Sequence, residues 1–247
     1  MKNYAVIQHT YSEFLGLIEA QLEKRDIGFS YIRPFVGQAL PGSAMQFDAL
    51  FLLAGAFPTT DDDAYPWVED ELETIGVFLD VERPIVGIGM GGLLVARYFG
   101  GTAHEEPMFN AYFTTARMTE AGKDDRVARA LDGRRVLVMY NGSVDLAGGV
   151  EPILVDEAGK WIAARPDPMA YALLFRPEIK PGMLEDIVME ANHPVPDNMD
   201  ELIAEARAEW PRLQQATDEL VVALVKELDL MRERRKPPVF NLRIEQE

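Results

Sequence analysis

The first hundred residues alternate between short apolar runs and segments in which apolar residues recur at helical spacing. Four runs have the length of buried strands, and they span residues 4–7, 29–34, 47–54 and 84–88. The segments with helical spacing are residues 13–25, 67–79 and 91–98. Because continuous apolar strands that alternate with amphipathic helices are typical of parallel sheets covered on both faces, we expect an α/β fold with a central, mostly parallel sheet flanked by helices.

The pattern changes after residue 100. Short strands separated by Gly, Asp and Pro turns are predicted as far as about residue 178, at residues 136–139, 153–155, 161–164 and 170–175. Beyond a Pro-Val-Pro segment the composition shifts to helix formers, with a start at Asn198 and Glu201 that resembles a capping box. We therefore divide the chain into a main domain, residues 1–190, and a helical C-terminal extension, residues 191–247.

The second helix of this extension is predicted to begin near Pro211, since proline suits a first helical turn. It carries an apolar stripe formed by Leu213, Leu220, Leu224, Leu228 and Met231. Val221 and Val225 widen the stripe beyond a coiled-coil seam, which favours a helix packed in a groove. The stripe either packs on its own domain, the interpretation that we favour, or forms an interface with another subunit.

Composition narrows the possible partners. The 247 residues include 41 acidic and 24 basic side chains, for a net charge of -17, and such a negative field repels nucleic acid and anionic lipid. The absence of cysteine excludes disulfides, thiolate metal sites and thiol nucleophiles, and it fits a reducing cytosol. The sequence contains no secretion signal and no apolar run of about 18 residues, so we expect a cytoplasmic protein without a membrane span.

Residues 84–101 carry the most informative motif, Pro-Ile-Val-Gly-Ile-Gly-Met-Gly-Gly-Leu-Leu-Val-Ala-Arg-Tyr-Phe-Gly-Gly. This segment resembles the nucleophile elbow of class I glutamine amidotransferases, which reads P-x-x-G-I-C-x-G-x-Q-x-x-A followed by Gly-Gly. In that family the cysteine lies on a strained turn between a strand and a helix, where backbone N–H groups stabilise an oxyanion. Gly89 occupies the cysteine position here, and Leu93 replaces the family's glutamine.

Other segments extend the resemblance over about residues 3–185. Leu53-Ala54-Gly55-Ala56-Phe57 is similar to the Leu-Gly-Gly-Pro-Met loop that supplies an oxyanion-hole N–H. The opening of GMP-synthase-like amidotransferases is matched by Gln8-His9 with Glu13 and Gly16. The family's proline, tryptophan and following acidic helix are matched by Tyr65-Pro66-Trp67 with Glu71. Finally, Leu174-Phe175-Arg176-Pro177-Glu178 resembles the Phe-His-Pro-Glu motif that carries the catalytic histidine and its acidic partner.

The resemblance implies that ordinary glutaminase chemistry is lost. A cysteine–histidine–glutamate triad needs a thiol, a base that activates it and an acid that orients the base. Arginine at the histidine position stays protonated near neutral pH and cannot act as that base. The candidate residues of a degenerate site or ligand pocket are therefore Gly55, Gly89, Met90, Arg176 and Glu178.

Several interpretations of these residues stay open. The glycine-rich turn is either a packed vestige of the elbow, a phosphate cradle whose spacing differs from the nucleotide fingerprint, or part of a pocket for a small carboxylate or amide. Arg176 either clamps a ligand carboxylate or pairs with Glu178 and plugs the site, because an unpaired buried arginine would be costly.

The sequence gives little support for a metal site. His9, His104 and His193 lack the spacing of metal ligands, so we expect surface or loop histidines. Asp61-Asp62-Asp63 is expected to be a solvated loop or a helix cap. No metal and no other cofactor is predicted.

Two functional hypotheses follow. The first is a non-catalytic amidotransferase-like protein that acts by binding, as a regulatory or assembly subunit of a synthase or a homo-oligomer, or as a sensor of a small amide or carboxylate. The second is an enzyme of amidotransferase or hydrolase type that uses the same pocket with non-thiol chemistry or a partner subunit, with Glu178 as the candidate acid or base.

Overall fold

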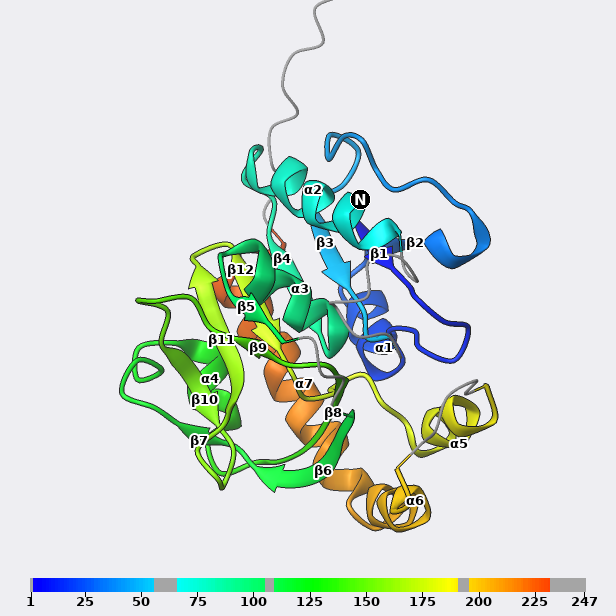
Figure 1. Ribbon diagram of the computed structural model, residues 1–247, viewed down its shortest axis with the longest axis vertical. Helices are drawn as coiled ribbons and strands as arrows, with labels where there is room; N and C mark the ends of the chain where they lie inside the picture. Colours follow the sequence, from blue (N-terminus) through cyan, green and yellow to red (C-terminus); the bar gives the residue numbers. More distant parts are fainter. Residues whose placement is uncertain (1, 56–65, 105–108, 191–195, 232–247) are drawn as a thin grey trace, which may run out of the picture.

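A central sheet of eight strands organises the computed structural model, which describes residues 2–55, 66–104, 109–190 and 196–231. The strand order is β2-β1-β3-β4-β12-β11-β10-β7 (Figure 1). The strands are β1 (Lys2–Ile7), β2 (Ile27–Ile32), β3 (Ala49–Leu52), β4 (Ile85–Ile88), β7 (Arg117–Met118), β10 (Pro152–Val155), β11 (Trp161–Asp167) and β12 (Ala170–Leu173). The five strands from β2 to β12 are parallel and the last three are antiparallel, so the predicted mostly parallel α/β fold is confirmed.

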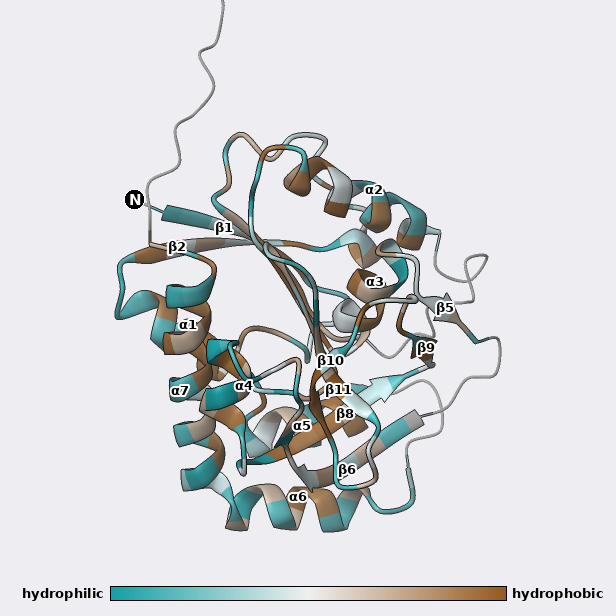
Figure 2. Ribbon diagram, turned by 90° about the vertical axis from the view of Figure 1, so that its left-hand side faces the viewer, coloured by the Kyte–Doolittle hydropathy of each residue, from teal (hydrophilic) through white to brown (hydrophobic). Residues whose placement is uncertain are grey.

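Helices cover both faces of this sheet. The helices are α1 (Leu17–Glu23), α2 (Trp67–Leu79), α3 (Met90–Tyr98), α4 (Arg126–Leu131), α5 (Pro181–Glu190), α6 (Met199–Ala208) and α7 (Trp210–Glu227). Figure 2 shows α1, α4 and α7 on one side of the sheet and α2 and α3 on the other. Successive strand side chains point to opposite faces, and in β1 Tyr4 and Val6 join the cluster with α1 and α7 while Ala5 and Ile7 join the cluster with α2 and α3. This double burial explains the continuous apolar runs of the sequence.

A smaller antiparallel pair lies beside the main sheet. It consists of β6 (Phe109–Thr115) and β8 (Arg135–Asn141), and a second short pair is formed by β5 (Thr102–Ala103) and β9 (Val144–Asp145). Apolar side chains of β6 and β8, including Leu137 and Met139, pack in one cluster with Leu184 of α5 and Leu202 of α6. The β6–β8 pair therefore anchors these two helices to the molecule.

Helix α7 packs into the main core. Its residues Leu220 and Leu224 are buried in the cluster that also contains α1, α4 and one face of the sheet. The Tyr4 hydroxyl donates to the Leu230 carbonyl at 2.8 Å, and the Thr217 hydroxyl donates to the Pro177 carbonyl at 2.6 Å. The apolar stripe thus packs on its own chain. Met231, predicted to belong to it, is exposed because α7 ends before it.

One helix start differs from the sequence prediction, and another lacks the expected cap. Helix α1 begins at Leu17 rather than near residue 13, because Gly16 has a φ of +49° and turns the chain so that the Leu17 N–H donates to the Glu178 carbonyl at 2.9 Å. Asn198 does precede α6, but its side chain makes no capping bond. Among the described helices, none is long and apolar enough to cross a bilayer.

Candidate functional site

Gly89 forms a sharp turn between the end of β4 and the start of α3. Its φ of 57° and ψ of -117° belong to a region that glycine reaches easily and side-chain-bearing residues reach only under strain. The turn is held on both sides, because the Gly89 N–H donates to the Leu173 carbonyl at 2.8 Å and the Gly89 carbonyl accepts from the Leu93 N–H at 3.1 Å. The strand–turn–helix geometry expected of the motif is therefore present.

The space beside this turn is filled. A Cβ on Gly89 would lie 2.8 Å from the Cβ of Ala54 and 3.2 Å from the carbonyl oxygen of Met139. A Cβ on Gly55 would lie 3.0 Å from the sulfur of Met90, which is itself fully buried. The structure thus brings together three of the predicted residues, Gly55, Gly89 and Met90, in a packed arrangement with Ala54 against the turn.

Arg176 and Glu178 lie just beyond the end of β12, the strand next to β4. The Arg176 Nε is 2.5 Å from the Glu178 Oε1, and its Nη1 is 3.1 Å from the Oε1 of Glu13. The Arg176 backbone N–H also donates to the Leu137 carbonyl of β8 at 2.8 Å. We call Glu13, Arg176 and Glu178 the site cluster; it contains the predicted pair and a second carboxylate that the sequence did not suggest.

Burial controls the electrostatics of the site cluster. The side chains of Arg176 and Glu178 are each 1% exposed. Burial alone would lower the pKa of Arg176, but the carboxylates of Glu178 and Glu13 outweigh it and raise the pKa. For Glu178, burial raises the pKa and the Arg176 guanidinium opposes this only in part. Arg176 is therefore a fixed cation, whereas the ionised form of Glu178 is disfavoured.

Two atoms of the site cluster have no hydrogen-bond partner among the described residues, the Nη2 of Arg176 and the Oε2 of Glu178. With both carboxylates ionised, two negative charges surround one positive charge. A buried donor or acceptor that stays unpaired is unfavourable by about 1–3 kcal/mol. A contribution to the stability of the fold therefore does not by itself explain the site cluster.

His9 lies in the loop after β1, one of the two places predicted for it, but it is not a surface residue, because its side chain is 0% exposed. Its Nδ1 lies 3.1 Å from the Ala54 carbonyl oxygen, and its Nε2 lies 3.0 Å from both carboxylate oxygens of Glu71 on α2. The ring follows β1 and faces the same loop that packs against Gly89. Sequence reasoning placed His9 and Glu71 in matching motifs but missed that they contact each other.

The other candidates lie away from this site or outside the described residues. His104 is half exposed and contacts Asp145 at 2.8 Å. Asp61-Asp62-Asp63 and His193, with Ala56, Phe57 and Tyr65 of the motifs, fall in segments that the structure does not describe. Within the described residues, no group of His, Asp or Glu is arranged to hold a metal ion.

Comparison with solved structures shows which fold this chain shares. A glutamine amidotransferase from Methylobacillus flagellatus matches with a TM-score of 0.79 and 19% identity, over 92% of this chain and 96% of that one. A glutamine amidotransferase from Thermotoga maritima matches with a TM-score of 0.73 and 19% identity, over 92% and 98% of the two chains. The fold is therefore that of the class I glutamine amidotransferases.

A sequence relative agrees with this class. The glutamine amidotransferase-like protein YfeJ of Salmonella typhimurium is 27% identical over 119 residues, which are 47% of this chain and 50% of YfeJ. The match thus spans about half the length of that relative. No family model matches the sequence. In both sequence and fold, the chain is glutamine amidotransferase-like.

Proposed function

We propose that this chain is a catalytically degenerate glutamine amidotransferase-like protein that acts by binding, as a regulatory or assembly subunit. The carrying observation is the packing at Gly89, where the Ala54 Cβ would lie 2.8 Å from any added Cβ. From the family resemblance we expect glycine at position 54 and cysteine at position 89. This chain instead has alanine at position 54 and glycine at position 89, so the larger of the two side chains is at position 54. Ala54 therefore takes the space that a nucleophile would need.

The site cluster supports the same proposal. The position that resembles the family's histidine is an arginine whose pKa is raised by two carboxylates, so it has no lone pair with which to accept a proton. The carboxyl group of Glu178 contacts the Arg176 guanidinium at 2.5 Å instead of orienting a base. Nucleophile and base are both missing from the arrangement that a glutaminase requires.

The ligand that we propose for the site cluster is a small amide. The unpaired Nη2 of Arg176 and Oε2 of Glu178 offer one donor and one acceptor, which match the carbonyl and N–H₂ groups of an amide. A carboxylate ligand would add a further negative charge beside Glu13 and Glu178. Because the two side chains are each 1% exposed, ligand entry requires the pair to open. As a partner we propose a synthase subunit or a second copy of the chain.

Ammonia release from glutamine tests the proposal. We expect no release by the purified wild type and a gain by the triple variant Ala54→Gly, Gly89→Cys, Arg176→His, which restores the thiol, the base and the space. The matched control is the double variant Gly89→Cys, Arg176→His, which should gain less because the new Cβ meets Ala54. Steady release by the wild type would contradict the proposal and favour an enzyme that uses other chemistry in the same pocket.

A further inference from the structure

The imidazole of His9 is enclosed between two groups that only accept hydrogen bonds. Nδ1 lies 3.1 Å from the carbonyl oxygen of Ala54, and Nε2 lies 3.0 Å from both oxygens of Glu71. The side chains of His9 and Glu71 are 0% exposed. A neutral imidazole carries a single N–H, so when the Glu71 carboxylate is ionised both contacts are hydrogen bonds only if the ring is protonated on both nitrogens.

We infer that His9 is held as an imidazolium, and that its proton regulates the proposed binding site by fixing Ala54, which follows β3, against the turn at Gly89. The inference rests on the proposed function only in taking this turn as part of a ligand pocket. The bonded carbonyl belongs to Ala54, the residue whose Cβ fills the space beside Gly89. His9 is thus a positioning residue, since it acts through Ala54.

Loss of one ring proton from His9 breaks its hydrogen bond to Ala54 and leaves its hydrogen bond to Glu71 intact. The remaining N–H stays on Nε2, because there it faces a carboxylate, which is a stronger acceptor than a carbonyl. The lone pair of Nδ1 then faces the carbonyl oxygen of Ala54, and two acceptors in contact repel each other. The bond to the loop is therefore lost while the bond to Glu71 is retained, and Ala54 is free to move away from Gly89.

The surrounding charges determine the direction of this switch. Among the described residues, the charged groups that act on His9 are Glu71 of α2 and, more weakly, Glu13 of the loop after β1. Glu13 is itself paired with Arg176. Burial alone would lower the pKa of His9, but Glu71 and the Ala54 carbonyl outweigh it and raise the pKa. Because the pKa of His9 is raised in the folded protein, the bonded state is fully present below the ordinary histidine pKa and is lost as pH rises through the pKa of the folded protein.

Nitrogen NMR of the histidine rings tests the inference directly. The chain has three histidines, and a His9→Gln variant assigns the signals of His9. We expect the His9 midpoint to lie above the ordinary histidine value of about 6.5, with both ring nitrogens protonated below that midpoint. The backbone amide of Gly55 should shift with the same midpoint. A His9 midpoint at or below the ordinary value, or a Gly55 amide that does not follow the titration, would overturn the inference.

A pair of variants on α2 separates this mechanism from a general structural effect. Glu71→Gln should lower the His9 midpoint. Glu69→Gln, which removes a carboxylate that contacts Arg97 and is 59% exposed, should leave the midpoint unchanged. Equal effects of the two variants would contradict a specific His9–Glu71 pair. These measurements use no ligand, so a failure of the proposed function in the glutamine assay and a failure of this inference are seen in different experiments.

Discussion

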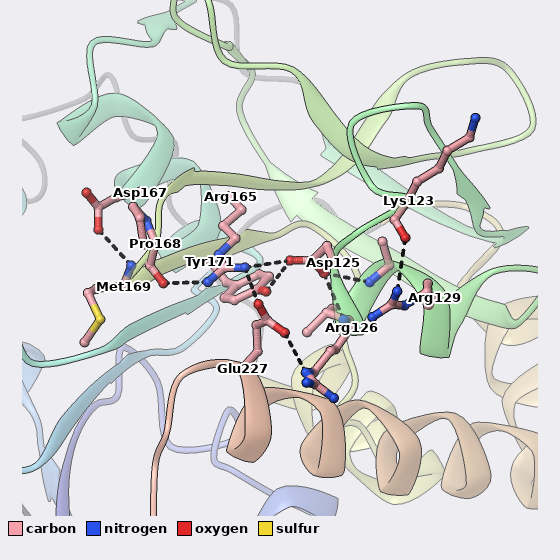
Figure 3. A network of polar contacts seen from close by, with 12 residues as sticks. Lys123, Asp125, Arg126, Arg129, Arg165, Asp167, Pro168, Met169, Tyr171 and Glu227 are labelled. Atoms are coloured by element: carbon pink, nitrogen blue, oxygen red, sulfur yellow. Dashed lines mark hydrogen bonds and ion pairs between the residues drawn. The ribbon is translucent and has the colours of Figure 1, made fainter. Parts of the chain in front are cut away.

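Two arginine-centred clusters lie near the two ends of strand β12, and they differ in what surrounds the cation. The site cluster follows the strand, and an outer cluster of Asp125, Arg165, Tyr171 and Glu227 lies at its start (Figure 3). Each places one arginine between two carboxylates. The Arg176 side chain is 1% exposed, however, whereas that of Arg165 is 21% exposed.

The outer cluster ties four elements together. Asp125 caps α4, because its Oδ1 accepts from the N–H groups of Val127 and Ala128 at 2.8 and 2.9 Å. Its Oδ2 accepts from the Tyr171 hydroxyl of β12 and from Arg165 of β11. Arg165 reaches Glu227 of α7 at 2.6 Å. A cap, a buried hydroxyl and a partly solvated ion pair each stabilise the fold.

The difference indicates what each cluster is for. Arg165 leaves one nitrogen unpaired, but the site cluster leaves both an arginine nitrogen and a carboxylate oxygen of Glu178 unpaired. Fully buried ion pairs are often no more stabilising than apolar side chains of the same volume. The outer cluster therefore contributes to stability, whereas the role that we propose for the site cluster is binding. Predictions that compare matched substitutions in the two clusters test this contrast.

The largest effect is expected when each arginine is replaced by leucine. Arg176→Leu leaves the buried carboxyl groups of Glu13 and Glu178 without their cation, and we expect a loss of about 3–5 kcal/mol in the free energy of unfolding. Arg165→Leu leaves carboxylates that water reaches in part, so a loss of about 1–3 kcal/mol is expected. Urea denaturation of the two variants at neutral pH measures both. Equal losses would remove the distinction between the clusters.

A smaller effect is expected for Tyr171→Phe in the outer cluster. The variant removes one charge-assisted hydrogen bond to Asp125 from the core, and we expect a loss of about 1–2 kcal/mol. Burial, together with the charge of Asp125, raises the pKa of Tyr171, so the hydroxyl remains a donor and the loss should be constant over neutral and mildly alkaline pH. Tyr112→Phe, which removes a half-buried bond to Asp156, is the control and should lose less.

The parallel half of the sheet was predictable because its strands are buried on both faces and therefore read as continuous apolar runs. The predicted runs 4–7 and 84–88 correspond to β1 and β4, and the helix at 67–79 corresponds to α2. Strand β6 was missed because polar residues interrupt its pattern, and α4 was missed because six residues are too few to show helical periodicity.

The site was only partly predictable. The turn at Gly89 and the pair of Arg176 and Glu178 are local in sequence, so a motif reveals them. The contact between His9 and Glu71 joins residues 62 positions apart, and its consequence depends on burial that no local pattern encodes. A histidine beside a strand and an acidic residue on an amphipathic helix each look like ordinary surface groups until the fold brings them together.

The smallest effect on the free energy of unfolding is expected for Glu178→Gln. The sign of this effect, a gain rather than a loss, separates the two clusters most clearly. Burial raises the pKa of Glu178, so the native state favours the protonated form and loses stability as pH rises through that pKa. Glutamine remains neutral and still accepts from Arg176. We therefore expect the variant to be more stable than the wild type by up to about 1 kcal/mol at mildly alkaline pH, a gain that shrinks as pH falls.

The matched substitution in the outer cluster is Glu227→Gln, which weakens the contacts of Glu227 with Arg165 and Arg126 at 2.6 and 3.2 Å. Because these contacts are partly solvated, we expect a loss of about 0.5–1 kcal/mol. Urea denaturation at several pH values, with wild type, Glu178→Gln and Glu227→Gln side by side, measures both signs. If Glu178→Gln also lost stability at every pH, Glu178 would be a stabilising carboxylate like Glu227, and the site cluster would need no binding role to explain it.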